Sequence, residues 1–212
     1  MEILSIAIFI LILLFSVIFH EVAHGLMAEK LGDSTARYMG RLTLNPIPHI
    51  DLFGSILLPL TMWIATAGNF VIGAAKPVPV DYNNLRNHKR DIFLVSIVGP
   101  LTNFSLALIS TAVLRFVPNI SSIAQSLLLQ TIVLNIGLTI FNLLPIPPLD
   151  GSKVLASLFG FIDQSWMYKI LEFERFGFII LIVFLMTGLL DTILYPPIVF
   201  LIGLLLGQDI RL

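Results

Sequence analysis

The sequence contains no cysteine, and charged side chains make up only 12% of its 212 residues. The first absence excludes disulfide bonds and any metal site built from thiolates. A formal net charge of −1 and the lack of a basic or low-complexity tail argue against nucleic acid as a partner. What is abundant is apolar: 57% of the residues are hydrophobic, and the mean hydropathy is +0.98. This composition is typical of a protein whose solvent is the lipid bilayer.

Most of the chain falls into apolar blocks, at about residues 3–29, 53–73, 92–116, 122–146 and 174–207. The first block has no basic leader and no small-residue cleavage site, so we expect a retained membrane helix rather than a signal peptide. Asp191 and the Pro196-Pro197 pair interrupt the last block, which predicts a C-terminal pair of helices joined by a tight turn. No repeat or linker separates the blocks, which favours a single membrane-embedded domain over residues 1–212.

The most specific pattern lies inside the first apolar block, where residues 20–24 read His-Glu-Val-Ala-His. Metal-seeking side chains are costly in a bilayer, so such a cluster is a functional-site hypothesis by default. Residues four apart on an α-helix share a face and lie roughly 6 Å apart along its axis, so the His20 and His24 rings can converge on one cation. Zinc held by two imidazoles and a carboxylate keeps a position open for water and lowers its pKa, which lets the adjacent Glu21 act as a general base.

A catalytic zinc site of this kind needs a third protein ligand. In one soluble pattern a third histidine stands six residues after His24, but that position is Lys30, and a glutamate some twenty residues downstream is also missing. Two candidates remain. His49 ends the run Asn-Pro-Ile-Pro-His, and Asp150 follows a proline-broken apolar run and precedes a glycine.

Further motifs accompany His-Glu-Val-Ala-His in order along the chain: N-P-I-P-H-I-D-L-F-G at 45–54, A-K-P-V-P-V at 75–80, G-P-L-T-N at 99–103 and N-L-L-P-I-P-P-L-D-G at 142–151. Together they resemble the site-2 protease family of intramembrane zinc metalloproteases, in a short form without a PDZ or CBS domain. The motif-bearing core is residues 1–155, and the C-terminal pair over 174–207 carries no motif.

The resemblance implies that His20, His24 and Asp150 bind one Zn²⁺ per chain and that Glu21 is the catalytic base. It also implies that Asn103 helps to hold the substrate or the developing oxyanion. Asn142 either takes part in this or bridges helices. His49 then supports the site or anchors its loop instead of binding the metal.

Topology can be inferred by requiring Asp150 to lie on the same membrane side as His20 and His24. Blocks 92–116 and 122–146 form a hairpin, so residues 30–91 start and finish on one side, and 53–73 is predicted to be re-entrant. Of the 12 Lys and Arg side chains, all but Arg115 then share that side, which marks it as cytoplasmic. Residues 35–45 and 76–80 look extended and predict short strands there.

The predicted fold is therefore an all-α polytopic membrane protein with about five spanning helices, a re-entrant segment and short cytoplasmic-side β-strands. The predicted function is intramembrane proteolysis in a prokaryotic cell membrane, with transmembrane-helix proteins as substrates and the active site toward the cytoplasm. The two strands would offer an edge to an unwound substrate. A metal-ion or proton transporter built on the same cluster is the alternative, and a non-catalytic scaffold is a third. The oligomeric state is left open.

Overall fold

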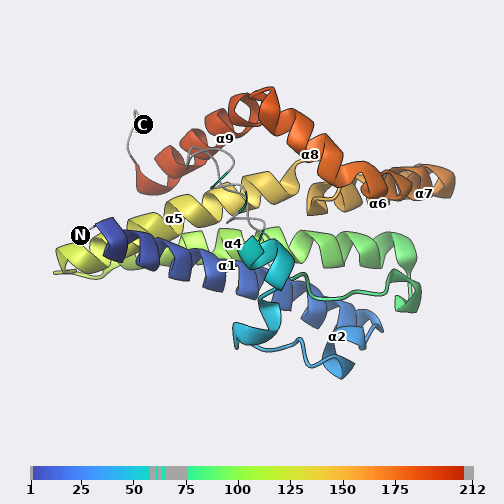
Figure 1. Cartoon of the computed structure of the whole chain (residues 1–212), viewed down its shortest axis with the longest axis horizontal. Coiled ribbons are helices and arrows are strands. Elements are labelled where there is room, and N and C mark those ends of the chain that lie inside the picture. The colour runs from blue at the N-terminus through green and yellow to red at the C-terminus, as the bar shows by residue number, and fades with distance from the viewer. Residues whose placement is uncertain (1, 58–60, 62–63, 65–75, 208–212) are drawn as a thin grey trace. The chain divides into compact units, whose positions relative to one another are not determined.

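A computed structural model describes residues 2–57, 61, 64 and 76–207, and Figure 1 shows the chain. Within these residues it is helical, with no strand. The helices are α1 (Glu2–Leu31), α2 (Thr35–Tyr38), η1 (Ile47–His49), η2 (Leu52–Leu57), η3 (Tyr82–Asn84), α4 (His88–Phe116), α5 (Ser122–Leu143), α6 (Asp150–Ile162), α7 (Gln164–Glu172), η4 (Phe173–Phe176), α8 (Gly177–Met186) and α9 (Leu189–Leu206). They form two compact units, Met1–Asn84 and Leu85–Leu212. The prediction of a single domain stays a prediction.

The first unit is built on α1, whose stretch Leu4–Leu31 is long and apolar enough to cross a membrane. The helix ends where Gly32 adopts a φ of +121°, a conformation that favours glycine, and its N–H returns to the Glu29 carbonyl. Asp33 follows, fully buried. Its carboxylate accepts hydrogen bonds from the backbone of Thr35 and of Asp81 and from the Asn84 side chain, at 2.8–3.1 Å. Asp33 thus ties the end of α1 to the segment that closes the unit.

The strand predicted over residues 35–45 is wrong, because the chain turns into α2 there. The Asp33 carboxylate accepts the Thr35 N–H at 3.1 Å and thereby starts a helical turn. Gly40, with a φ of +64°, ends that turn, and bends follow. β-prone side chains specify a strand only where a partner strand offers a ladder.

Most of the predicted re-entrant segment, residues 53–73, lies outside the described residues. Its described beginning is the π-helix η2. Asp51 starts this helix, since its carboxylate accepts the Gly54 N–H at 2.6 Å and its carbonyl accepts the Ser55 N–H at 2.9 Å.

In the second unit, α4 and α5 form the predicted hairpin, and α9 lies along it (Figure 1). The helices meet in a core of fully buried apolar side chains from all three, namely Ala107, Ile132, Ile136 and Ile202. Beyond α5, a second cluster joins the proline-rich turn to α8 and the start of α9 through Leu144, Ile146, Leu149 and Leu190. α6 then packs along the first half of α4, and α7 folds back on α6.

The last apolar block contains two helices, α8 and α9, but their junction is not where the prolines predict it. The chain bends at Gly188, whose φ is +69°, while Pro196 and Pro197 lie inside α9. Because Leu190 packs beside Leu144 whereas Ile202 packs beside Ile132, α9 runs antiparallel to α5. α8 and α9 therefore form one bent path, not a hairpin.

This path changes the expected count of spanning helices. Within the described residues, 4 helices are long and apolar enough to cross a membrane: α1, α4, α5 and α9. α8 has 10 residues, about 15 Å, and is too short to cross alone. α9 ends at Gly207, where an added Cβ would lie 3.1 Å from the Arg115 guanidinium. The last helix thus ends beside Arg115. The predicted pair of spanning helices would instead have returned to the end where α8 begins. Arg211 lies outside the described residues.

Candidate metal centre

His20 and His24 lie on one buried face of α1, as their spacing predicts. Their rings meet edge to face with centroids 4.6 Å apart, and the two Nε2 atoms are 3.0 Å apart. Ser16 lies one turn earlier on the same face and is also buried. Two imidazole nitrogens aimed at each other from within one helix form a donor pair that suits a divalent cation such as zinc. The residues present in this unit therefore fit a metal site.

Glu21 is half-buried, and its Oε2 accepts a hydrogen bond from the backbone N–H of Val78 at 2.7 Å. The donor belongs to residues 76–80, which lie across α1 at this level. Gly25 shows how close the approach is, since a Cβ there would lie 2.7 Å from Val78 Cγ1 and 2.5 Å from Leu42 Cδ2. The glycine that follows His24 is thus needed for the chain to reach Glu21.

Residues 76–80, the crossing segment, are held by two residues outside the metal motif. Arg41 is buried, and its Nη2 donates to the carbonyls of Lys76 at 2.8 Å and Pro77 at 3.2 Å. The Lys76 N–H in turn donates to the His49 carbonyl at 2.9 Å. Sequence reasoning missed Arg41 as part of this site. A single arginine between Gly40 and an apolar run carries no spacing signal, and only the tertiary contact identifies it.

The strand predicted over residues 76–80 is also wrong. Pro77 and Pro79 have no N–H, and the N–H groups of Lys76 and Val78 are already bonded to His49 and Glu21. A strand edge needs alternating donors that are available to a partner. Of these five residues, only Val80 has an N–H that makes no hydrogen bond to another described residue. The segment thus positions Glu21 and has little capacity to add a strand.

His49 is fully buried, and its Nε2 is 2.8 Å from the Thr43 carbonyl oxygen. With the bond from Lys76 to its own carbonyl, it joins the 43–49 loop to the crossing segment. These contacts are consistent with the predicted anchoring role, which stays a prediction.

Asp150 belongs to the second unit, where it is half-buried and begins α6. The turn before it follows the end of α5, and Leu149 donates its N–H to the Ile146 carbonyl at 2.9 Å. Gly151 lies so close to α5 that a Cβ would come within 2.2 Å of the Leu143 carbonyl oxygen and 2.3 Å of that of Leu144. The close approach at Gly151 therefore places the backbone of Asp150 at the end of α5.

Asn103 and Asn142 both lie in the second unit, but their contacts differ. Asn103 is fully buried in α4, and its amide donates to the Asn135 side chain of α5 at 2.8 Å. Asn142 donates to the Leu138 carbonyl one turn back in its own helix at 3.0 Å. Asn135, also fully buried, is a residue that sequence reasoning missed. The sequence did offer a signal for it, because Asn135 is a polar residue within the apolar block 122–146, in addition to Asn142.

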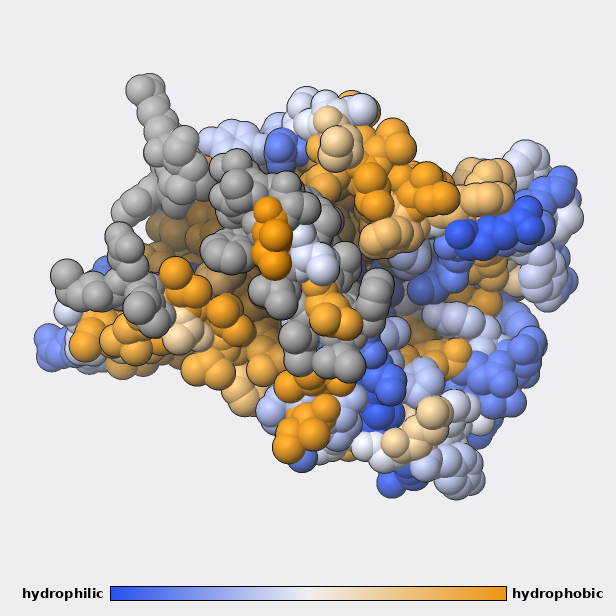
Figure 2. All heavy atoms as spheres, in the orientation of Figure 1, coloured by the Kyte–Doolittle hydropathy of each residue, from blue (hydrophilic) through white to orange (hydrophobic). Residues whose placement is uncertain are grey.

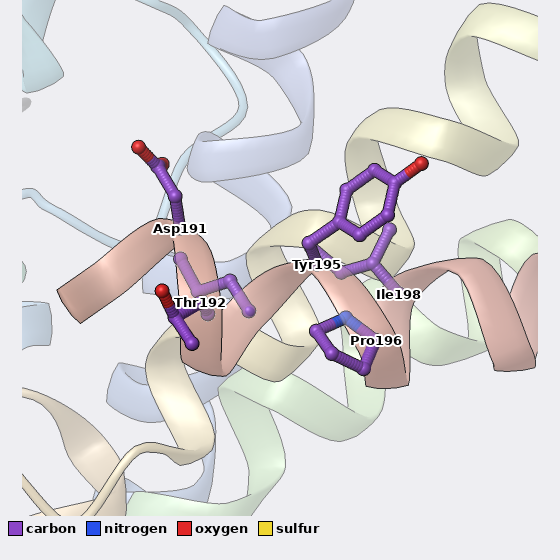
Figure 3. Close-up of a pocket in the computed structure, with 6 residues that line it drawn as sticks. Asp191, Thr192, Tyr195, Pro196 and Ile198 are labelled. Atoms are coloured by element: carbon purple, nitrogen blue, oxygen red, sulfur yellow. The ribbon is translucent and has the colours of Figure 1, made fainter. Parts of the chain in front are cut away.

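A separate hollow of about 670 Å³ runs along α9 (Figure 3) and contains none of the predicted site residues. It is lined by Asp191, Thr192, Leu194, Tyr195, Pro196 and Ile198. Its lining is mostly apolar and comes from a single helix, so we assign it no chemistry.

Comparison with known proteins gives consistent results. The family model described as peptidase family M50 matches residues 8–124 and 115–188. The chain is 37% identical over 195 residues to "Putative zinc metalloprotease YwhC" of Bacillus subtilis (strain 168), which covers 88% of this chain and 84% of the relative. It is 28% identical over 190 residues to "Putative zinc metalloprotease Rip2" of Mycolicibacterium smegmatis, covering 88% of this chain and 70% of the relative. No solved structure matches the chain.

Proposed function

The chain belongs to peptidase family M50, and from this membership we propose that it is an intramembrane zinc metalloendopeptidase. Its substrates would be membrane proteins, cut in or near their transmembrane segments. It is an integral membrane protein with helices long and apolar enough to span. A metal-ion or proton transporter is not favoured, because the family is one of peptidases.

The observation that carries the proposal is the metal motif on the buried face of a helix that can span the membrane. His20 and His24 supply two nitrogen ligands, and Asp150 supplies the third. Two imidazoles and one carboxylate form a ligand set of catalytic zinc sites, with a position left for water. Zinc bound there supplies Lewis acidity toward water and toward the scissile carbonyl.

Glu21 is the general base in this proposal. Its carboxylate takes a proton from the attacking water and later returns it to the leaving amine nitrogen. The Val78 N–H donates to Oε2 of Glu21 at 2.7 Å and so restrains its carboxylate, and Arg41 and His49 hold the segment that carries Val78. The substrate helix has to unwind locally, because its peptide carbonyls are otherwise bonded within the helix. Asn103 and Asn142 are candidate contacts for that unwound stretch.

The orientation of the protein is proposed from its charges. Arg86, Lys89 and Arg90 lie at the start of α4, and Arg115 lies at its other end. The excess of positive charge marks the start of α4 as cytoplasmic. Asp150, at the end of α5, returns toward the same side. The active site would thus face the cytoplasm.

The test is cleavage of a single-span membrane protein by the purified protein, with bound metal measured on the same samples. Glu21→Gln is expected to keep its zinc and lose activity at least about 100-fold, because the general base is gone while the ligands remain. His24→Ala and Asp150→Asn are expected to lose both zinc and activity. His88→Ala, a histidine at the start of α4, is the matched control and should change neither. Activity retained in Glu21→Gln would refute the assigned base, and zinc retained at wild-type affinity in both ligand variants would refute the ligand set.

A further inference from the structure

The turn between α6 and α7 exposes large apolar and aromatic side chains. We name Phe161, Ile162, Trp166 and Tyr168 the hairpin patch. They are exposed to 59%, 82%, 52% and 52% respectively. The opposite faces of the same two helices are buried, through the small residues Ala156, Ser157 and Gly160 on α6 and through Met167 on α7. The hairpin is therefore amphipathic, with one face packed within the unit and the other presented outward.

The hairpin patch is held rigidly. Met167 of α7 is fully buried, and a Cβ on Gly160 would lie 3.0 Å from its sulfur, so the two helices are in close contact. Asp163 caps α7 by accepting the Ser165 N–H at 2.8 Å and its hydroxyl at 2.9 Å. These bonds hold the pKa of the Asp163 carboxyl below its usual range. A rigid outward-facing patch loses little conformational entropy when it binds a partner.

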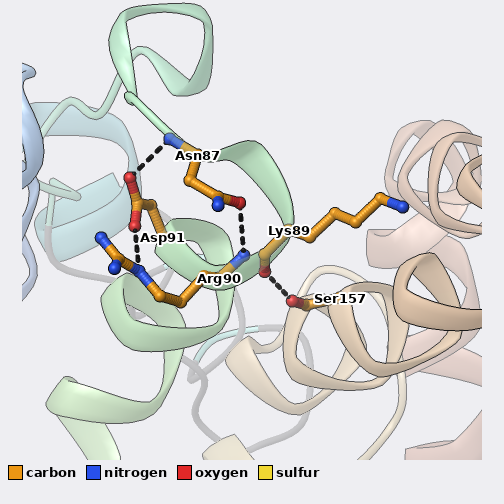
Figure 4. A network of polar contacts seen from close by, with 5 residues as sticks. All are labelled: Asn87, Lys89, Arg90, Asp91 and Ser157. Carbon is orange, nitrogen blue, oxygen red and sulfur yellow. Dashed lines mark hydrogen bonds and ion pairs between the residues drawn. The ribbon is translucent and has the colours of Figure 1, made fainter.

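The depth of the hairpin patch relative to the membrane can be inferred from α4. Between Asp91 and Arg115 this helix has no charged residue over residues 92–114. A helix of that length spans roughly 34 Å, close to the thickness of a bilayer's hydrocarbon core. The first turn of α4 therefore lies at the headgroup level, where Asn87, Arg90 and Asp91 cap the helix with their own bonds (Figure 4).

α6 is attached at that same level. Its Ser157 hydroxyl donates to the backbone carbonyl of Lys89 in the first turn of α4 (Figure 4). Phe161, Ile162 and α7 follow Ser157 in the chain, and Figure 2 shows hydrophilic side chains over the region of α7 and hydrophobic ones over that of α8. The hairpin patch thus lies where hydrocarbon gives way to headgroups.

The chemistry of the hairpin patch fits that zone. Tryptophan and tyrosine are enriched at membrane interfaces, because one end of each ring is apolar and the other hydrogen-bonds. The Lys169 ammonium lies 5.2 Å from the centre of the Trp166 ring. The acidic groups nearby are engaged: Asp163 with Ser165, Asp91 with Arg90, Glu172 with Arg175 and Glu174 with Lys153. The charges of Lys89 and Lys169 also help to lower the pKa of Asp163, but neither lysine forms an ion pair with it among the described residues, so both can bind a phosphate.

We propose that the α6–α7 hairpin is an interfacial anchor that binds phospholipid headgroups. The hairpin patch inserts at the level of the lipid carbonyls, and Lys89 and Lys169 bind the phosphates of anionic lipids. This surface is separate from the metal centre and does not depend on proteolysis. It sets the depth of α6, whose first residue, Asp150, lies twelve residues or roughly 18 Å along the helix from Ile162.

Trp166 reports on its own depth. The sequence has 2 tryptophans, so Trp63→Phe leaves Trp166 as the sole tryptophan in the full chain, and it can be excited selectively over tyrosine. This variant is reconstituted into vesicles with lipids brominated at shallow or deep acyl positions. Shallow bromines should quench Trp166 more than deep ones, because the hairpin patch lies near the headgroups and away from the bilayer centre. In the matched control, Trp63→Phe and Trp166→Phe are combined with Val133→Trp on the exposed face of α5, and deep bromines should quench it more.

Two results would overturn the anchor. Quenching of Trp166 by aqueous iodide but by no brominated lipid would place the hairpin patch in water. Protection from both quenchers would show that protein covers it, either a second copy or another part of the chain.

The lysines are tested by lipid competition. In mixed vesicles, brominated phosphatidylglycerol should quench Trp166 more than brominated phosphatidylcholine at equal mole fraction. The double substitution Lys89→Gln and Lys169→Gln should remove that preference while leaving the shallow depth unchanged. Equal quenching by both lipids in the protein with intact lysines would refute phosphate binding.

Discussion

Asp33 shows how one buried carboxylate can hold a unit together. Burial alone would raise its pKa, but hydrogen bonds from Asn84, Thr35 and Asp81 together outweigh that cost and hold the pKa below its ordinary value. A carboxyl whose pKa is lower in the folded than in the unfolded state stabilises the fold above its unfolded value, about pH 4. That stability is lost as the pH falls through the folded pKa.

Asp33→Asn should therefore destabilise the protein at neutral pH by about 2 kcal/mol, since bonds to a charged acceptor are replaced by weaker ones. The difference in stability from wild type should shrink as the pH falls from 5 to 3, because wild type then loses the same charge. Thermal unfolding in detergent across this range measures both. Asp163→Asn is the comparison variant. The Asp163 carboxyl also has a lowered pKa, but it caps a helix at an exposed position in the other unit and joins no distant segments. A difference that stays constant from pH 7 to pH 3 would contradict the assignment.

The contact between α4 and α5 depends on a polar pair as well as on the apolar core. Asn103 and Asn135 are both fully buried, and the Thr139 hydroxyl of α5 lies 3.3 Å from the Pro100 carbonyl of α4. Pro100 has no N–H, so the Ser96 carbonyl four residues earlier loses its partner within α4, while the Thr139 bond links the carbonyl of Pro100 itself to α5. Polar bonds between helices in a bilayer contribute about 1 kcal/mol each.

Asn135→Leu should weaken this contact, because it leaves the Asn103 amide without its bond across the helices. We expect a loss of about 1–2 kcal/mol in unfolding by a denaturing detergent. Val133→Leu, on the exposed face of the same helix, should be neutral. If Asn135→Leu is as stable as wild type, the pair does not hold the helices together.

At the level of elements, the sequence predicted what is local. The long apolar helices and the α4–α5 hairpin are as expected, since length and hydropathy determine them. The bend at Gly188 was not predicted, because a glycine in an apolar run is a weaker signal than two prolines. The strands failed for a related reason: β-propensity in residues 35–45 says nothing about whether a partner strand exists.

The same division holds for the whole molecule. The convergence of His20 and His24 follows from a spacing of four within one helix. The bond from Val78 to Glu21 joins residues 57 apart in sequence, and no periodicity encodes it. Arg41 and Asn135 likewise act through partners that only the folded chain brings near. Motif spacing identified the proposed chemistry, and tertiary contacts supply the groups that position it.

The path of the last helix decides the topology of the whole chain. Because α9 ends beside Arg115, an odd number of crossings follows α5, whereas a hairpin of two spanning helices would return to the starting side. The chain has no cysteine, so single cysteines can be placed without background. Gln164→Cys on α7 should react with an impermeant thiol reagent only in inverted vesicles, given the proposed orientation. Val117→Cys and Leu206→Cys should react from the outside of intact cells.

The informative comparison is between Leu206→Cys and the two reference variants, Val117→Cys on one side of the membrane and Gln164→Cys on the other. If Leu206→Cys reacts from the same side of the membrane as Val117→Cys, the result supports the bent path of α8 and α9, whichever side proves to be cytoplasmic. Labelling that follows Gln164→Cys would instead restore the hairpin that Asp191 and the prolines predicted. Since the unsubstituted chain cannot react, any signal comes from the introduced thiol, and the side on which Gln164→Cys reacts independently tests the orientation inferred from the positive charges at the start of α4.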